Sequence, residues 1–213
     1  MTDATADPPA DPQAAEAGAP LRLAHTDWLH HRLIVTGPDD AIAALQDLAT
    51  GAGSIPWQLD LDGMAEDWFH LLVAPPAGQP RQLSAAGARV LVGQVREAVE
   101  RRQQLALSRV GRSRACAFDL HALLPVPGAL LRLGPDHPRA LAWLWQHWGT
   151  TQMLRHVAED PEPAKRRAQV AGQGAWHLSF WSADWTPWRA LATLAGCWPM
   201  LRFEVRPTYD EAS

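Results

Sequence analysis

Tryptophan is the residue whose abundance and spacing most suggest a binding chemistry in this chain. There are 11 Trp against 4 Phe and 1 Tyr, and eight of the Trp lie between Trp143 and Trp198. An indole ring offers a large apolar face and one N–H donor. The segment therefore predicts either a tryptophan-rich core or an aromatic platform for bases, sugars or a partner protein. The core is the favoured interpretation, because large apolar side chains are buried more often than not.

A second group of residues with binding chemistry is a basic segment from Arg89 to Arg114. It holds seven Arg against the two acids Glu97 and Glu100, a local excess of five positive charges. Such a run is usually a solvated helix face with i,i+4 ion pairs, here Glu97 with Arg101. The alternative chemistry is phosphate binding, for which the contacts would come from Arg96, Arg101, Arg102, Arg109, Arg112 and Arg114.

The nine histidines show no spacing that predicts a metal site. His30 and His31 are adjacent and point to opposite faces of a strand, and no H-x-x-x-H pair occurs. A site assembled from the distant His70, His121 and His177 is disfavoured. One enzymatic alternative stays open, because an imidazole at His31, His121 or His177 could act as acid or base in an RNA-cleaving nuclease.

Other enzyme signatures are missing from the sequence. There is no phosphate-binding loop, no complete G-x-G-x-x-G and no G-x-S-x-G. The run from Asp60 to Gly63 is similar to a calcium loop, but Phe69 stands where the bidentate Glu belongs. Cys116 and Cys197 lie in apolar contexts typical of buried, inert thiols. We therefore expect no cofactor and no metal, and we favour a protein that is not an enzyme.

Length and charge set the broad class. The 213 residues, with a formal charge of −4 and 47% hydrophobic residues, predict one ordinary domain that is not a general polyanion binder. No apolar window is long enough for a transmembrane helix, and the acidic start lacks a signal pattern, so we expect a cytoplasmic protein.

Residues 1–25 predict a disordered tail, and residues 26–213 a single domain. Abundant Ala, Arg and Pro with a single Lys indicate a GC-rich bacterial genome.

The strands and helices that must position these residues are predicted from the spacing of the apolar residues and from the residues that start and end such elements. Alternation predicts strands at 30–36, 68–73, 115–124, 176–182 and 200–206. Three-to-four spacing predicts helices at 39–49, 84–107, 137–148 and 185–195. Removing an insertion of strand plus helix at 66–112, together with the 137–148 helix, leaves the order β-α-β-β-α-β. This predicts an α+β fold with a ferredoxin-like split βαβ core, whose antiparallel sheet has helices on one face and whose last two strands are neighbours.

Four short motifs carry a family resemblance. They are Leu-Leu-Pro-Val-Pro at 123–127, Trp-x-x-x-x-Trp-Gly-Thr at 143–150, Phe-Trp-Ser-Ala-Asp-Trp-Thr-Pro at 180–187, and Trp-Pro-x-Leu-x-Phe at 198–203. In this order they resemble the YubB-type ferredoxin-like proteins, an uncharacterised family found largely on plasmids, on phages and in bacterial genomes. The resemblance covers about residues 28–211. It implies the ferredoxin-like fold and a mobile-element background, and it implies no reaction.

The chain departs from that family's pattern at three places. Thr151-Gln152 stands where the family has Lys-Trp, and His147 stands where it has Asn. The segment 182–187 has one residue more than the corresponding motif of the family. A ligand contact made by the family Lys would therefore be missing from this chain.

The favoured hypothesis is a non-enzymatic binding or accessory protein of mobile-element type, with a protein partner held by a tryptophan belt. The belt comprises Trp143, Trp148, Gly149, Thr150, Trp181, Asp184 and Trp185. The alternative role for the same residues is to lock the last helix to the sheet. The alternative function is nucleic-acid binding or RNA cleavage through the segment 89–114. No membrane partner is expected.

Overall fold

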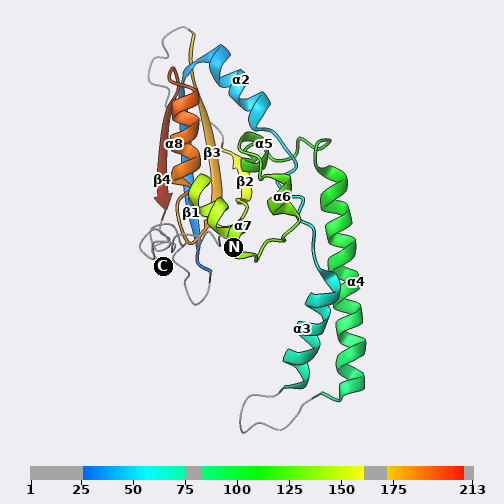
Figure 1. Cartoon of the computed structure of the whole chain (residues 1–213). Coiled ribbons are helices and arrows are strands. Elements are labelled where there is room, and N and C mark those ends of the chain that lie inside the picture. The colour runs from blue at the N-terminus through cyan, green and yellow to red at the C-terminus, as the bar shows by residue number, and fades with distance from the viewer. Residues whose placement is uncertain (1–25, 75–82, 161–171, 209–213) are drawn as a thin grey trace, which may run out of the picture.

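The computed structural model describes residues 26–74, 83–160 and 172–208, which form an α+β structure around a four-stranded sheet (Figure 1). The predicted tail at 1–25 lies outside the described residues. The strands are β1 (Trp28–Pro38), β2 (Arg155–Glu159), β3 (Gln173–Ala183) and β4 (Arg202–Thr208). They lie in the order β2-β3-β1-β4, and every neighbouring pair is antiparallel. The predicted antiparallel sheet is thereby confirmed.

Strand β1 sits at the centre and alternates between two environments. Leu33 and Val35 are fully buried, whereas Arg32 before them is exposed and Ile34 between them is half-buried. Leu33 pairs with Leu178 of β3 and with Val205 of β4. Because cross-strand partners share a face, these rows of apolar side chains form the floor of the core.

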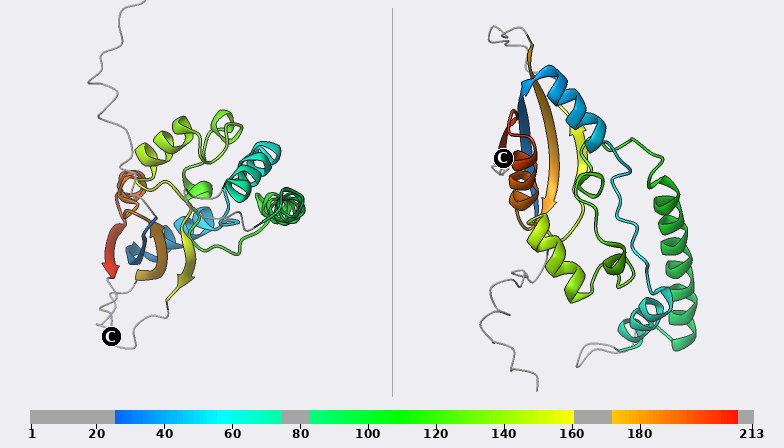
Figure 2. Two further views of the ribbon diagram at one scale, coloured as in Figure 1. Left: turned by 90° about the horizontal axis from the view of Figure 1, so that it is seen from below. Right: turned by 45° about the horizontal axis from the view of Figure 1, so that its top comes forward.

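Three helices cover that floor on one side of the sheet (Figure 2). They are α2 (Asp39–Ala49), α7 (Pro138–His147) and α8 (Trp188–Cys197), and each contributes buried residues to the core. In α7, Pro138 occupies the first turn and the His137 side chain accepts a hydrogen bond from the N–H of Arg139. This arrangement follows the predicted helix start, because Pro fits where an N–H has no helical partner.

The chain after α7 enters the core through Trp148. Its ring is fully buried, and Nε1 donates to the carbonyl of Leu124 at 3.0 Å. Gly149 has φ +79°, and an added Cβ would lie 3.2 Å from the backbone nitrogens of Trp188 and Arg189. Glycine is needed here both for the left-handed backbone and for the close approach of α8. Thr150 is also fully buried and donates to the carbonyl of Ala183 at 3.0 Å.

The insertion at 66–112 is a helical hairpin rather than a strand and a helix. Helix α3 (Leu61–Val73) covers the predicted strand at 68–73, and α4 (Ala85–Arg109) confirms the predicted long helix. The Asp60 side chain caps α3 by accepting from the N–H of Gly63 at 2.9 Å. The two helices pack on each other and project away from the sheet (Figures 1 and 2).

Two further expectations on the strands were wrong, and one strand was not predicted. The segment 115–124 makes only an isolated bridge from Cys116 to Gly51, and then the short helix α5 (Leu120–Leu123) begins at the Asp119 cap. The short helix α6 (Gly128–Leu131) follows the proline turn. The second edge strand is β2, which periodicity did not predict. Strands β3 and β4 share the sheet as expected but are separated by β1.

None of the helices in the described part of the chain combines the length and the apolar character needed to cross a bilayer.

We predict that Trp148→Ala lowers the free energy of unfolding by about 3–5 kcal/mol, because it empties a fully buried site. Trp188, which is 59% exposed, provides the matched control, and Trp188→Ala should change stability by less than about 1 kcal/mol. Urea unfolding followed by circular dichroism measures both. If Trp148→Ala does not fold, Trp148→Phe should fold with an intermediate loss. A loss below about 1 kcal/mol for Trp148→Ala would contradict the buried role.

Candidate functional site

The second face of the sheet carries the side chains that alternate with the core residues, and no described helix covers it (Figure 2). On β1, the register opposes His30 to Trp181 and Thr208, Arg32 to Ser179 and Arg206, and Ile34 to His177 and Glu204. Cross-strand partners project to the same side. We call this the open face; its aromatic and cationic members are Trp28, His30, Arg32, Arg155, His177, Trp181, Arg202 and Arg206.

Two ring contacts gather the aromatic residues of the open face at one end. The rings of His30 and Trp181 have centroids 5.1 Å apart and are tilted by 51°. The Arg155 guanidinium carbon lies 3.7 Å from the centroid of the Trp28 ring, a cation–π contact. All three rings are half-buried, so each retains solvent-accessible surface. The result is a shelf of π-faces on the two central strands, with a cation beside it.

An irregularity in β2 brings Arg155 to this shelf. The β2–β3 register shifts between Arg155 and Ala158, and His156 has φ +48°. Arg155 is opposite Trp181 in that register. A bulge bends the edge strand and redirects a side chain. The guanidinium is thereby carried over the ring of Trp28 two strands away.

The open face carries more positive than negative charge. Arg32, Arg155, Arg202 and Arg206 contribute four cations. Glu204 accepts from Nε of Arg206 at 2.8 Å, which neutralises one of them.

A second carboxylate, Asp160, accepts from the Ser179 hydroxyl at 2.8 Å and lies at the end of β2 remote from Arg155. Arg32 and Arg155 therefore lie near the aromatic shelf, whereas Arg202 lies opposite Thr36 at the other end of β1. The acids Asp27 and Asp184 adjoin the shelf next to Trp28 and its partner Ala183.

Beneath the shelf, on the core side, His31 joins β1 to the segment before α8. His31 is fully buried and stacks on Phe180 with centroids 5.3 Å apart. Its Nδ1 lies 2.9 Å from the carbonyl of Leu29, which can only accept, and its Nε2 lies 2.8 Å from Oγ1 of Thr186. Nδ1 therefore donates, and Nε2 of the neutral ring accepts from the Thr186 hydroxyl.

Burial lowers the pKa of His31 below 6.5; the neighbouring His30 adds to this effect, and the hydrogen bond to Leu29 opposes it. Burial also lowers the pKa of His121, against the opposing effect of Asp119. Both imidazoles are therefore held neutral near pH 7.

The tryptophan belt does not form one surface. Trp148 and Thr150 are core residues, as described above, and Trp181 lies on the open face. On the helix side, Trp143 stacks on His147 with centroids 4.2 Å apart, and Trp185 meets Trp145 edge-on at 5.8 Å.

The remaining two belt residues shape the chain. Gly149 lets α8 approach the segment after α7, and Asp184 adopts φ +59° and accepts from the N–H of Asp27 at 2.9 Å. Of the belt, Trp148, Gly149 and Thr150 lie where the helix layer meets the sheet, whereas Trp181 remains as a surface candidate.

The arginines of the segment 89–114 are spread along the hairpin and its base. Arg96 pairs with Asp62 at 2.8 Å and with Glu100, and Arg101 pairs with Glu97 at 3.5 Å. The last pair confirms the predicted i,i+4 contact.

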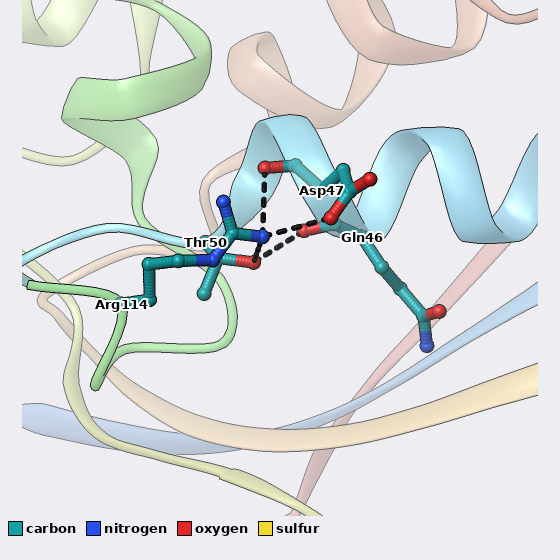
Figure 3. A network of polar contacts seen from close by, with 4 residues as sticks. All are labelled: Gln46, Asp47, Thr50 and Arg114. Atoms are coloured by element: carbon teal, nitrogen blue, oxygen red, sulfur yellow. Dashed lines mark hydrogen bonds and ion pairs between the residues drawn. The ribbon is translucent and has the colours of Figure 1, made fainter.

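Arg114 lies elsewhere, against the end of α2. One of its guanidinium nitrogens contacts the Asp47 carboxylate at 2.8 Å, the Asp47 carbonyl and the Thr50 hydroxyl (Figure 3). Arg102, Arg109 and Arg112 are exposed and make no ion pair with another described residue. The six arginines therefore do not line one continuous phosphate track.

No cluster of three or more metal-ligating side chains occurs among the residues that the structure describes. Burial raises the pKa of Cys116 to about 11, so its thiol is protonated and a poor nucleophile at neutral pH. Cys197 is exposed and unpaired with Cys116.

Sequence reasoning missed Trp28, His30 and Arg155 as site residues. The alternation of the first strand contained a signal, since every second residue from Trp28 to Ile34 must leave the core. No comparable signal existed for Arg155, because β2 is five residues long and polar.

Comparisons with known proteins add one structural neighbour. No family model matches the chain, and no curated protein matches it. Among solved structures, the chain is similar to the crystal structure of a protein api92 from Yersinia pseudotuberculosis, labelled with the family model DUF1281. The TM-score is 0.43 and the identity 12%, over 86% of this chain and 90% of that chain.

We predict that stability falls as the pH drops through about 6.5, because the unfolded chain takes up a proton on His31 before the folded chain does. His31→Asn retains a donor near the Leu29 carbonyl but cannot titrate. The stability difference between wild type and this variant should be largest above about pH 7 and shrink toward about pH 5. Urea unfolding across this pH series tests it. The exposed His70→Gln variant should track the wild type, and a pH-independent difference for His31→Asn would contradict the assignment.

Proposed function

We propose that this chain is a non-enzymatic binding protein on a ferredoxin-like core, and that the open face of its sheet binds single-stranded nucleic acid. The fold part of the proposal rests on the strand order β2-β3-β1-β4 with antiparallel neighbours. Strands β1 and β2 flank β3, and β3 and β4 flank β1, so each pair of parallel strands has another strand inserted between them. This is the arrangement of two split βαβ units. The motif resemblance to the YubB-type proteins agrees with it.

The observation that carries the proposed ligand is the position of the aromatic shelf on the two central strands. Trp28 and His30 lie on β1, Trp181 lies on β3, and all three are on the side that the helices leave uncovered. Every nucleobase has a π-face, and stacking on an aromatic side chain contributes about 1–3 kcal/mol per base. Rings on adjacent central strands of an antiparallel sheet therefore suit successive unpaired bases.

The cations around the shelf suit the sugar–phosphate backbone. Arg155 lies beside Trp28, and Arg32 is exposed on β1; Arg206, opposite Arg32, is already paired with Glu204. Guanidinium groups bind phosphate oxygens through paired N–H donors. A base-paired duplex keeps its π-faces inside the stack, so a flat sheet can stack only on single strands.

The open face replaces the tryptophan belt and the segment 89–114 as the proposed binding surface. Two belt residues, Trp148 and Thr150, are fully buried, and Arg96, Arg101 and Arg114 are engaged in ion pairs. The mobile-element setting rests on the motif resemblance alone.

We predict that the protein binds fluorescein-labelled single strands of about 12 nucleotides, measured by fluorescence anisotropy, and leaves them intact. Trp181→Ala should weaken binding about 10-fold or more, whereas Trp181→Phe, which keeps a stacking face, should lose much less. Arg155→Gln should weaken binding and flatten its dependence on salt between about 50 and 200 mM. RNA and DNA strands are tested in parallel, with a duplex of the same sequence as the negative probe.

Two matched controls lie away from the open face. Trp185→Ala removes an exposed ring on the helix side, and Arg102→Gln removes an exposed cation from α4. Neither should change the affinity. Absence of binding to any single strand would overturn the proposal, as would binding that Arg102→Gln abolishes and Trp181→Ala leaves unchanged. Cleavage of the RNA would overturn the non-enzymatic part.

A further inference from the structure

A polar pocket lies at the base of the helical hairpin, away from the sheet. It is bounded by the end of α2, the turn after α4 and the start of α5, and its volume is about 340 Å³. None of its lining residues belongs to a strand of the sheet. The polar side chains that line it are those of Thr50, Ser54, Arg112, Ser113, Arg114 and His121, with Asp119 in the wall.

His121 supplies a hydrogen-bond donor to this pocket. Its Nδ1 accepts from the backbone N–H of Val126 at 3.2 Å. Nδ1 is therefore unprotonated, and the neutral ring carries its hydrogen on Nε2. Among the described residues, nothing accepts from Nε2.

Arg114 is fixed in position, and several of its N–H donors remain for a ligand. Its three contacts to Asp47 and Thr50 all use the same terminal nitrogen, which fixes the guanidinium against the end of α2 (Figure 3). A guanidinium has five N–H donors, so most of them remain for a ligand. Arg112 on the same turn is exposed and adds a second positive charge to the lining.

The one carboxylate in the wall is already satisfied by the backbone. Asp119 accepts from the N–H groups of Gly53 and His121 at 2.8 Å and from that of Ala122 at 3.4 Å. These three donors stabilise its carboxylate, which keeps its negative charge, and fix it as the cap of α5. The lining therefore presents two guanidinium groups, of which that of Arg114 is paired with Asp47, an imidazole N–H and the hydroxyls of Ser54 and Ser113. The Thr50 hydroxyl already donates to the carbonyl of Gln46.

We infer that this pocket binds a phosphomonoester dianion. Guanidinium groups match phosphate oxygens in geometry and charge, and the hydroxyl and imidazole groups add further hydrogen-bond donors. The single carboxylate of the wall cannot accept from all of these donors. The volume is at the lower end of small-molecule sites, which suits a nucleoside monophosphate or the phosphorylated end of a strand. The shared chemistry is the terminal phosphate. The pocket shares no residue with the open face, so the two proposals can be tested independently of each other.

The experiment titrates the full-length protein with three probes: inorganic phosphate, adenosine 5′-monophosphate, and an oligonucleotide of about 12 nucleotides with and without a 5′-phosphate. Calorimetry gives the affinity at constant ionic strength, and the ring signals of His121 in NMR spectra locate the site. We expect saturable binding of at least one phosphomonoester with a shift of the His121 signals. Preference for the phosphorylated oligonucleotide identifies a strand end as the source, and preference for the mononucleotide identifies a free metabolite.

Three variants distinguish this site from general anion attraction. Arg112→Gln and His121→Asn should each weaken phosphate binding about 10-fold, the loss expected for one charge-assisted or buried hydrogen bond. Asn can still accept from Val126 but lacks the donor at Nε2, so His121→Asn should fold. Arg102→Gln removes a cation outside the pocket and should have no effect.

Two results would overturn the inference. One is the absence of saturable binding of inorganic phosphate and of adenosine 5′-monophosphate, together with equal affinity for the oligonucleotide with and without its 5′-phosphate. The other is binding that persists unchanged in both Arg112→Gln and His121→Asn. Trp181→Ala should leave phosphate binding unaltered, which separates this test from that of the open face.

Discussion

The pairing of β1 on both of its edges is the constraint on which the rest of the structure depends. Because β1 is bonded to β3 and β4 along nearly its whole length, its register fixes both faces of the sheet at once. Leu33 and Val35 face the helices, and His30 and Arg32 must therefore face away. A slip of one residue would bury the charged row and expose the apolar one. The core and the proposed binding surface are two consequences of a single register.

The helix layer is held to that sheet by polar contacts as well as by apolar packing. Trp148 and Thr150 each place a hydrogen-bond donor on a backbone carbonyl inside the core, and His31 reaches Thr186 before α8. An unpaired buried donor costs about 1–3 kcal/mol, so these contacts specify one position for the last helix. The same burial removes these residues from any binding surface. The face that the helices do not cover is the one that we propose for binding.

The errors made from the sequence have identifiable physical causes. The run at 68–73 is apolar without a break, and such a run cannot be assigned to strand or helix by periodicity alone. Its helical state is set by the Asp60 cap and by packing against α4, a cap that sequence reading had considered only as part of a failed calcium loop. Strand β2 was missed because its mostly polar residues have no local preference that predicts a strand. Its strand conformation is set by pairing with β3.

The sequence by itself determined the α+β class, the central and carboxyl-terminal strands and the starts of α2, α4 and α7, because alternation, Pro138 and terminal glycines act through neighbours in the chain. The sequence also identified tryptophan and arginine residues as candidates for a binding surface. Only the tertiary structure decided which of them are available: it buried Trp148, paired Arg96 with Asp62, and brought Arg155 over Trp28. These outcomes depend on contacts between residues far apart in the chain, and a linear pattern carries no information on which distant residues meet.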